Sequence, residues 1–110
     1  MSSYYVNTVP SAPPQNLVVT LTTSSSISIS WNPPPFEQQN GLIRYYLVYL
    51  TDINGNTLEL QTNDNSTDFT IENVVPVHNN YTVSLAAFTI GVGPSSSALT
   101  ISLPESGKLV

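Results

Sequence analysis

Cysteine is absent from this sequence and charged side chains are scarce: two residues are basic, seven are acidic, and charged residues make up only 8% of the chain. Without cysteine, neither a disulfide framework nor a cysteine-ligated zinc site can form. Nucleic-acid binding requires several Lys or Arg side chains that displace counterions from phosphates, and two basic residues do not supply them. The same shortage argues against heparin or an anionic membrane surface as a partner.

Long hydrophobic runs are also missing. No apolar stretch approaches the roughly 20 residues that cross a bilayer, so we expect no direct membrane insertion by this segment. No basic region followed by an apolar one opens the chain, so no signal peptide is expected. An extracellular location would therefore mean that the segment belongs to a longer polypeptide.

What the sequence does contain is enough apolar material for one domain: 110 residues, of which 40% are hydrophobic. The residue pattern indicates no helix. Apolar and polar residues instead alternate in short segments separated by Pro, Gly, Asn or Ser. The predicted strands span residues 16–21, 26–31, 43–50, 57–62, 68–72, 81–88 and 98–103. The pattern predicts loops over 33–41 and 90–96 and a type I′ hairpin turn at Asn54-Gly55. These seven short antiparallel strands predict an all-β sandwich of two sheets.

Several motifs occur in a recognisable order. They are Pro13-Pro14-Gln15-Asn16-Leu17, Ser30-Trp31-Asn32-Pro33-Pro34, Gly41-Leu42-Ile43-Arg44-Tyr45-Tyr46-Leu47-Val48, Tyr81-Thr82-Val83-Ser84-Leu85-Ala86-Ala87 and Gly91-Val92-Gly93-Pro94-Ser95. Together they resemble a fibronectin type III domain over about residues 10–104. The resemblance implies an immunoglobulin-like sandwich with Trp31 as the plug between the sheets. It also implies that Tyr81 forms a tyrosine corner, its hydroxyl bonded to upstream backbone.

The domain boundaries follow from the same comparison. We expect a linker or extension over residues 1–12, the domain over 13–104, and a second linker over 105–110. Two features depart from the family pattern. The leucine expected before the corner tyrosine is replaced by Val74 or Val75, and the loop between the last two strands contains no Arg-Gly-Asp. The integrin-binding role of some members therefore does not transfer.

Candidate catalytic and metal sites are weak. His78, the only histidine, falls in a predicted turn, and no nucleophile with a neighbouring base is apparent. The segment from Asp52 resembles the start of a calcium loop, but Gly55 stands at its fourth position and Asn63 at its twelfth, where Gly at the sixth and Glu at the twelfth are required. We predict no enzyme activity, no metal and no cofactor for this domain.

Two sequons, Asn65-Ser66-Thr67 and Asn80-Tyr81-Thr82, make Asn65 and Asn80 candidate glycosylation sites. Asn65 lies in a predicted turn and is the better acceptor, whereas Asn80 adjoins the corner tyrosine. The sequons permit an extracellular location without demonstrating one.

A candidate protein-contact face follows from strand alternation. If Tyr46, Val48 and Leu50 face the core, their neighbours on the strand face outward. The predicted outward side chains, with those of the adjacent strand, are Tyr45, Leu47, Tyr49, Ala86 and Phe88. Such a patch is typical of protein interfaces, but cross-strand packing that only stiffens the sheet is the simpler explanation.

The resemblance implies a non-catalytic extracellular module that acts as a spacer and protein-interaction domain in a multidomain receptor or adhesion protein. The entry Val9-Pro10-Ser11-Ala12-Pro13-Pro14 is similar to linkers between tandem copies in cell-adhesion receptors and receptor-type tyrosine phosphatases. The expected partners are neighbouring domains or an extracellular protein ligand, and the isolated domain is expected to be monomeric. Two alternatives remain: an accessory domain of a secreted carbohydrate-active enzyme, or a module of an intracellular filament protein.

Overall fold

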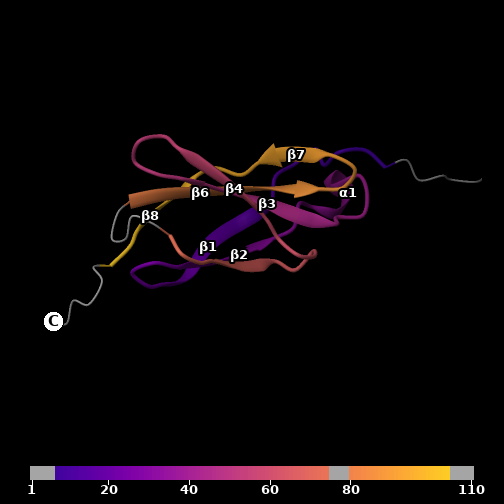
Figure 1. The fold of residues 1–110 in the computed structure, drawn as a ribbon. Coiled ribbons are helices and arrows are strands. Elements are labelled where there is room, and N and C mark those ends of the chain that lie inside the picture. Colours follow the sequence, from indigo (N-terminus) through magenta and orange to yellow (C-terminus); the bar gives the residue numbers. More distant parts are fainter. Residues whose placement is uncertain (1–6, 75–79, 105–110) are drawn as a thin grey trace, which may run out of the picture.

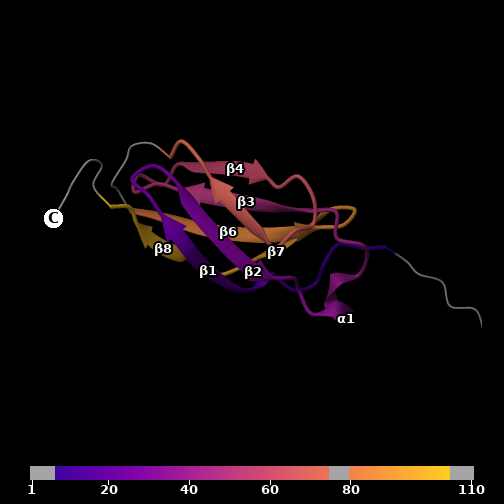
Figure 2. The ribbon, with the colours of Figure 1, turned by 90° about the horizontal axis from the view of Figure 1, so that it is seen from below.

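The computed structural model describes residues 7–74 and 80–104 and shows two antiparallel sheets packed face to face (Figure 1). The three-stranded sheet has the order β1 (Gln15–Thr22), β2 (Ile27–Asn32), β5 (Asp68–Ile71). The five-stranded sheet has the order β4 (Thr57–Gln61), β3 (Tyr45–Thr51), β6 (Asn80–Phe88), β7 (Val92–Ser95), and β8 (Leu99–Ser102) also pairs with β6. The view from below shows the strands of the smaller sheet crossing those of the larger (Figure 2). The predicted all-β sandwich is confirmed.

The core lies between the sheets and follows the alternation of the sequence. Every second residue of β2 and β6 is buried, and the residues between them are more exposed except Ala86. The buried cluster comprises Ile27, Ile29, Trp31, Ile43, Tyr46, Val48, Leu50, Ile71, Val74, Tyr81, Val83, Leu85, Ala87, Ile101 and Leu103. Trp31 is 2% exposed, and its ring centroid lies 5.1 Å from that of Tyr46. Val74 belongs to this core, whereas Val75 lies outside the described residues.

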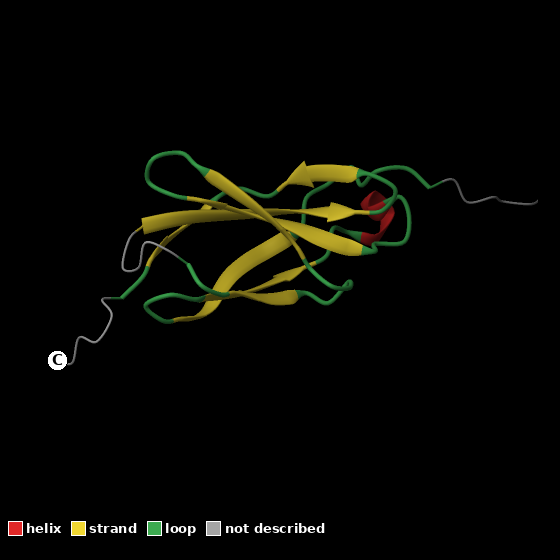
Figure 3. Cartoon of the chain, viewed as in Figure 1, coloured by secondary structure: helices red, strands yellow, loops and turns green. Residues whose placement is uncertain are grey.

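Two elements differ from the sequence prediction. A one-turn helix, α1 (Phe36–Gln39), occupies part of the predicted loop 33–41, at the end of the sandwich where the described chain begins (Figure 3). Pro35 precedes this turn, and Asn40 ends it at a φ of 59°, so the turn is formed by local residue preferences. A helix of one turn is too short to produce a periodic pattern in the sequence. The predicted loop 90–96 contains β7, which pairs with β6, so the described residues form eight strands.

The hairpin between β3 and β4 was predicted correctly, but its turn type was not. Gly55 has a φ of 86°, whereas Asn54 is not among the residues with positive φ, as a type I′ turn requires. The Gly55 N–H donates to the Asp52 carbonyl at 3.1 Å, and the Asp52 N–H donates to the Asn56 carbonyl at 2.9 Å. This pattern fits a type I turn followed by glycine in the left-handed region, and the Asp52 carboxylate supplies the acceptor that holds it.

The segment before β1 packs on the sandwich. The Thr8 N–H donates to the Asn40 carbonyl at 2.8 Å, and the Thr89 hydroxyl donates to the Thr8 carbonyl at 2.6 Å. Pro10 is fully buried. Residues 7–12, which we predicted as part of a linker, are therefore tied to the end of the domain that carries α1.

Candidate interaction surfaces

The predicted contact face on β3 and β6 is formed by directly paired residues. Tyr45 pairs with Phe88 and Leu47 with Ala86 across the two strands. The rings of Tyr45 and Phe88 stack with centroids 4.4 Å apart and an angle of 11° between their planes. The strand alternation therefore places these side chains on one face, as the sequence predicted.

Two members of this face are not exposed, which corrects the prediction. Leu47 is 7% exposed and Ala86 is 0% exposed. Both lie in the middle of the sheet, with larger side chains on the same face at neighbouring positions, so cross-strand packing covers them. Tyr45, Tyr49 and Phe88 remain partly exposed. The alternation of residues along the strands identified this face. It did not show that the larger side chains on the face cover the smaller ones.

Tyr49 connects this face to the edge strand β4. It pairs with Glu59, and its hydroxyl pKa is raised above the ordinary 10.0, mainly by burial and further by the negative charge of Glu59. Glu59 is therefore on the outer face of the sheet, and Leu58 and Leu60, its neighbours on the strand, point toward the core side.

A second surface, at the end that carries α1, was missed by sequence reasoning. Phe36, Leu42 and Ile90 are 82%, 71% and 60% exposed, and Val9 and Val92 are 44% and 43% exposed. These residues come from the N-terminal segment, from α1 and the loop after it, and from the turn between β6 and β7 with the start of β7, and these segments lie at this end of the sandwich (Figure 1). We call them the apolar pole. The sequence did contain one signal for this surface, because large apolar residues occur in segments that were predicted to be loops.

Hydrogen bonds hold the backbone of the apolar pole in place. The Ser11 N–H donates to the Gln38 carbonyl at 2.9 Å, and the Asn40 side-chain amide donates to the Val9 carbonyl at 3.0 Å. Gly91 approaches Val9 so closely that an added Cβ would lie 2.8 Å from a Val9 methyl carbon. The exposed apolar side chains therefore stand on an ordered backbone.

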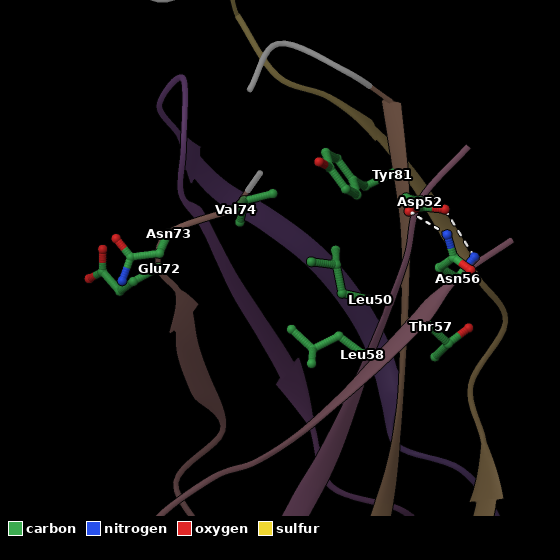
Figure 4. Close-up of a pocket in the computed structure, with 9 residues that line it drawn as sticks. All are labelled: Leu50, Asp52, Asn56, Thr57, Leu58, Glu72, Asn73, Val74 and Tyr81. Carbon is green, nitrogen blue, oxygen red and sulfur yellow. Dashed lines mark hydrogen bonds between the residues drawn. The ribbon is translucent and has the colours of Figure 1, made fainter. Parts of the chain in front are cut away.

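A groove lies at the opposite end of the molecule, where the β4 side of the sandwich is open. It has a volume of about 200 Å³ and is lined by Leu50, Asp52, Asn56, Thr57, Leu58, Glu72, Asn73, Val74 and Tyr81. Leu50 and Leu58 point from β3 and β4 toward the segment that follows β5, and Tyr81 closes the upper end (Figure 4). Burial raises the pKa of the Tyr81 hydroxyl, and the charge of Asp52 adds to the effect. The bond that we predict for this hydroxyl at the tyrosine corner stays a prediction.

The two candidate glycosylation sites differ in their surroundings. Asn65 is exposed in the loop between β4 and β5. Asn80 is exposed at the start of β6, but its side-chain oxygen accepts a hydrogen bond from the Ser102 hydroxyl at 2.7 Å. The Asn80 amide nitrogen, to which a glycan would be attached, is not the atom engaged in this bond, so the preference for Asn65 rests on its place in a loop.

Within residues 7–74 and 80–104, no group of three or more His, Asp or Glu side chains is placed to hold a metal ion. Asp52 accepts hydrogen bonds from the backbone N–H groups of Asn54 and Asn56, each at 2.9 Å. His78 lies outside the described residues. None of the helices in the described part of the chain has the length and apolar character needed to cross a membrane.

Comparison with known proteins shows related receptors. The chain is 34% identical over 98 residues to the tyrosine-protein phosphatase Lar of Drosophila melanogaster, and the aligned region covers 88% of this chain and 5% of Lar. It is 37% identical over 95 residues to protein sidekick-2 of Mus musculus, with 81% and 4% covered. It is also 37% identical over 100 residues to the netrin receptor DCC of Mus musculus, with 88% and 7% covered. The chain thus spans only a small fraction of these relatives.

Solved structures and a family model agree with this result. The FN5 domain of Drosophila Lar matches with a TM-score of 0.72 and 26% identity, over 89% of this chain and 100% of that domain. The FN1–FN3 domains of chicken CNTN1 match with a TM-score of 0.75 over 87% of this chain and 32% of theirs, at 21% identity, which shows the fold alone. The model of the fibronectin type III domain matches residues 12–102. The chain therefore belongs to the fibronectin type III family.

Proposed function

We propose that this domain is a spacer and protein-interaction module in the extracellular part of a multidomain receptor or adhesion protein, of the class that includes receptor-type tyrosine phosphatases. Fibronectin type III domains are generally non-catalytic modules. The relatives named above, Lar, sidekick-2 and the netrin receptor DCC, support the receptor context. They give no support to an accessory domain of a carbohydrate-active enzyme or a filament module.

The apolar pole is the observation that carries this proposal. Phe36, Leu42 and Ile90 expose apolar surface on an ordered backbone, and the described chain enters the domain at the same end. A domain that preceded this one in a longer polypeptide would be joined at this end. Exposed apolar patches of this kind typically mark contact surfaces, and contact with a neighbouring domain would fix the angle between the two.

The test replaces Phe36 and Ile90 by Ser in a fragment that contains this domain and the domain before it. The isolated domain should keep its free energy of unfolding within about 0.5 kcal/mol, because both side chains are exposed. In the two-domain fragment, the thermal midpoint of this domain should fall relative to wild type. Leu21→Ser is the matched control, since Leu21 is 62% exposed but belongs to β1. Equal loss of stability in the isolated domain and in the two-domain fragment would contradict the proposal.

The extracellular placement has its own test. In the full polypeptide produced by a secreting eukaryotic cell, the peptide that contains Asn65 should carry a glycosidase-sensitive mass increment, and this increment should be absent in Asn65→Gln. Asn80→Gln should leave the increment at Asn65 unchanged and is the matched control. An unglycosylated domain that a membrane-impermeant reagent does not label in intact cells would contradict the placement.

The outer face of β3 and β6 is a second proposed contact surface. Its support is the partly exposed aromatic group formed by Tyr45, Tyr49 and Phe88, with the Tyr45–Phe88 stack holding two of the rings in place. Tyr49→Ser should weaken binding of the full polypeptide to its protein ligand without unfolding the domain. Unchanged binding would leave cross-strand packing as the role of these rings.

A further inference from the structure

The exposed edges of the two sheets are not equally protected against pairing with another strand. β1 has register shifts against β2 between Gln15 and Val18 and between Val19 and Leu21. β5 has only four residues and begins with Asp68. Short length, irregular register and charged residues are the usual means by which natural sheets prevent edge pairing. The three-stranded sheet is therefore protected at both edges.

The edge formed by β7 and β8 is protected in similar ways. Each strand has four residues. β7 contains Pro94, which has no N–H to donate, and its pairing with β6 shifts between Ala86 and Phe88. Gly93 packs against Pro10, so the N-terminal segment approaches this strand.

β4 is the least protected of these edges: it has five residues, and its one charged side chain is Glu59. Its sequence, Thr-Leu-Glu-Leu-Gln, contains no proline, glycine or basic residue, and it pairs with β3 in unbroken register. The described residues place no strand against its other edge. β4 is therefore able to accept another strand.

The register shows which backbone groups of β4 are free. The Thr62 N–H donates to the Tyr46 carbonyl, and the Asp52 N–H donates to the Asn56 carbonyl. Hydrogen-bonded pairs alternate along an antiparallel ladder, so residues 58 and 60 bond to β3. The N–H and C=O groups of Thr57, Glu59 and Gln61 consequently point to the open edge.

The groove lies beside this edge on the core side. Leu58 is 54% exposed and lines the groove together with Leu50 and Val74 (Figure 4). In a strand added to β4, the residues opposite Leu58 and Leu60 would point toward the core side. Apolar side chains at those positions would cover the exposed part of Leu58 and extend over the groove.

Charge selects the chemistry of the occupant. Glu59 is at the centre of the edge, and Asp52 and Glu72 line the groove. Arg44, the one basic residue in the described part of the chain, precedes the end of β3 that lies away from this groove. A second copy of the domain, with its own net charge of −5, would place Glu59 opposite Glu59 if the two strands paired over their whole length. Lys or Arg is therefore favoured in a strand that pairs here.

We propose that the free edge of β4 binds an extended segment of another protein as an additional antiparallel strand. The segment alternates apolar residues, which face Leu58, Leu60 and the groove, with Lys or Arg residues, which face Glu59 on the outer side of the sheet. This mode of binding takes its affinity from main-chain hydrogen bonds and its selectivity from alternate side chains. It involves neither the apolar pole nor an extracellular location, so it stands apart from the proposed function.

The experiment uses a fluorescently labelled peptide, Thr-Lys-Val-Arg-Val-Lys-Thr, and the domain as it stands. Anisotropy should show saturable binding, and the NMR amide signals of Thr57, Glu59 and Gln61 should shift. N-methylation of the Lys and Arg amides removes the donors that face β4 and should weaken binding at least about tenfold. N-methylation of the Val amides, which face away, should leave the affinity within about twofold. Equal effects of the two modifications would overturn the proposal.

Two variants of the domain complete the test. Gln61→Pro removes an outward N–H and should weaken binding about fivefold or more, and Glu59→Lys should weaken it about tenfold by like-charge repulsion. Urea unfolding shows whether each variant is folded. If Gln61→Pro is not folded, Glu59→Lys still tests the proposal, because it keeps every main-chain donor of β4. No saturable binding up to about 1 mM, or signal shifts confined to the apolar pole, would overturn the proposal. So would self-association of the domain that is lost in Gln61→Pro, because a second copy would then be the occupant.

Discussion

The two edges of the five-stranded sheet, β4 and β7, end the same layer of backbone but are built from opposite residues. β7 combines Gly93, Pro94 and a register shift, and an N-terminal proline packs on it. β4 is regular, carries leucines at alternate positions, and is bordered by the groove. Both edges expose backbone groups that water must solvate. The difference shows that the ability of an edge strand to pair with another strand depends on its local sequence as well as on its position in the sheet.

The two edge strands are also held in place by different kinds of contact. β7 is fixed by long-range contacts, since Pro10 packs against Gly93 although the two lie far apart in sequence. β4 is fixed by a local turn in which the Asp52 carboxylate accepts hydrogen bonds from two backbone N–H groups. The two edges should therefore respond to different perturbations.

The largest expected effect tests the direction of the β4 backbone groups. Leu60→Pro removes a hydrogen bond to β3 and truncates the packing of a partly buried leucine, so it should lower the free energy of unfolding by about 3 kcal/mol or more. Gln61→Pro removes only an outward N–H and should cost about 1 kcal/mol or less. Urea unfolding of the two variants measures the difference. Equal losses would mean that Gln61 is not on the open side of the ladder.

The next effect tests the protected edge. In Gly93→Ala, the added Cβ would lie 2.7 Å from the Pro10 Cβ and 2.9 Å from the Pro10 carbonyl oxygen. Either the N-terminal segment or β7 must move, and overpacking of this kind typically costs about 1–3 kcal/mol. Thermal unfolding measures the loss. Hydrogen exchange should also become faster at the Ser11 N–H, which bonds to Gln38, and unchanged exchange there would show that the segment is not held by this contact.

A smaller expected effect is the change in the free energy of unfolding at acidic pH. Hydrogen bonds, first that from the Asn56 backbone, lower the pKa of the Asp52 carboxyl below its ordinary 3.8. Because the folded-state pKa is the lower one, this stabilisation is present above pH 3.8 and is lost as the pH falls through the folded pKa. Asp52→Asn should therefore show a flatter loss of stability between about pH 5 and about pH 2.5. Urea midpoints across that range measure it, with Asp68→Asn as the control. An identical acid limb in wild type and Asp52→Asn would contradict this role.

Alternation along the strands made most of the fold predictable. Ile27, Ile29 and Trp31 recur at every second position, which is the pattern of a β-strand with one face buried. The features that were missed depend on other information. α1 is a single turn and has no period to detect, and β7 contains Gly and Pro, which normally mark a loop.

The candidate surfaces were harder to predict because exposure depends on neighbours that are remote in sequence. Ala86 faces outward but is covered, since larger side chains from β3 lie beside it on the same face. Phe36 and Ile90 are exposed in segments that lie at the same end of the sandwich, which only the fold shows. The open edge of β4 likewise required the strand order, which alternation does not specify.

The smallest expected effect isolates the one charge that protects β4. Glu59→Gln keeps the shape of the side chain and should change the free energy of unfolding by no more than about 0.5 kcal/mol, because Glu59 is exposed. It should lower the pKa of Tyr49 toward the 10.0 of an unperturbed tyrosine, since the carboxylate that helps to raise it is gone. Ultraviolet titration of the tyrosines, with Tyr49→Phe to assign the signal, measures the shift. An unchanged Tyr49 titration would place Glu59 away from the outer face and remove the charge argument from the β4 edge.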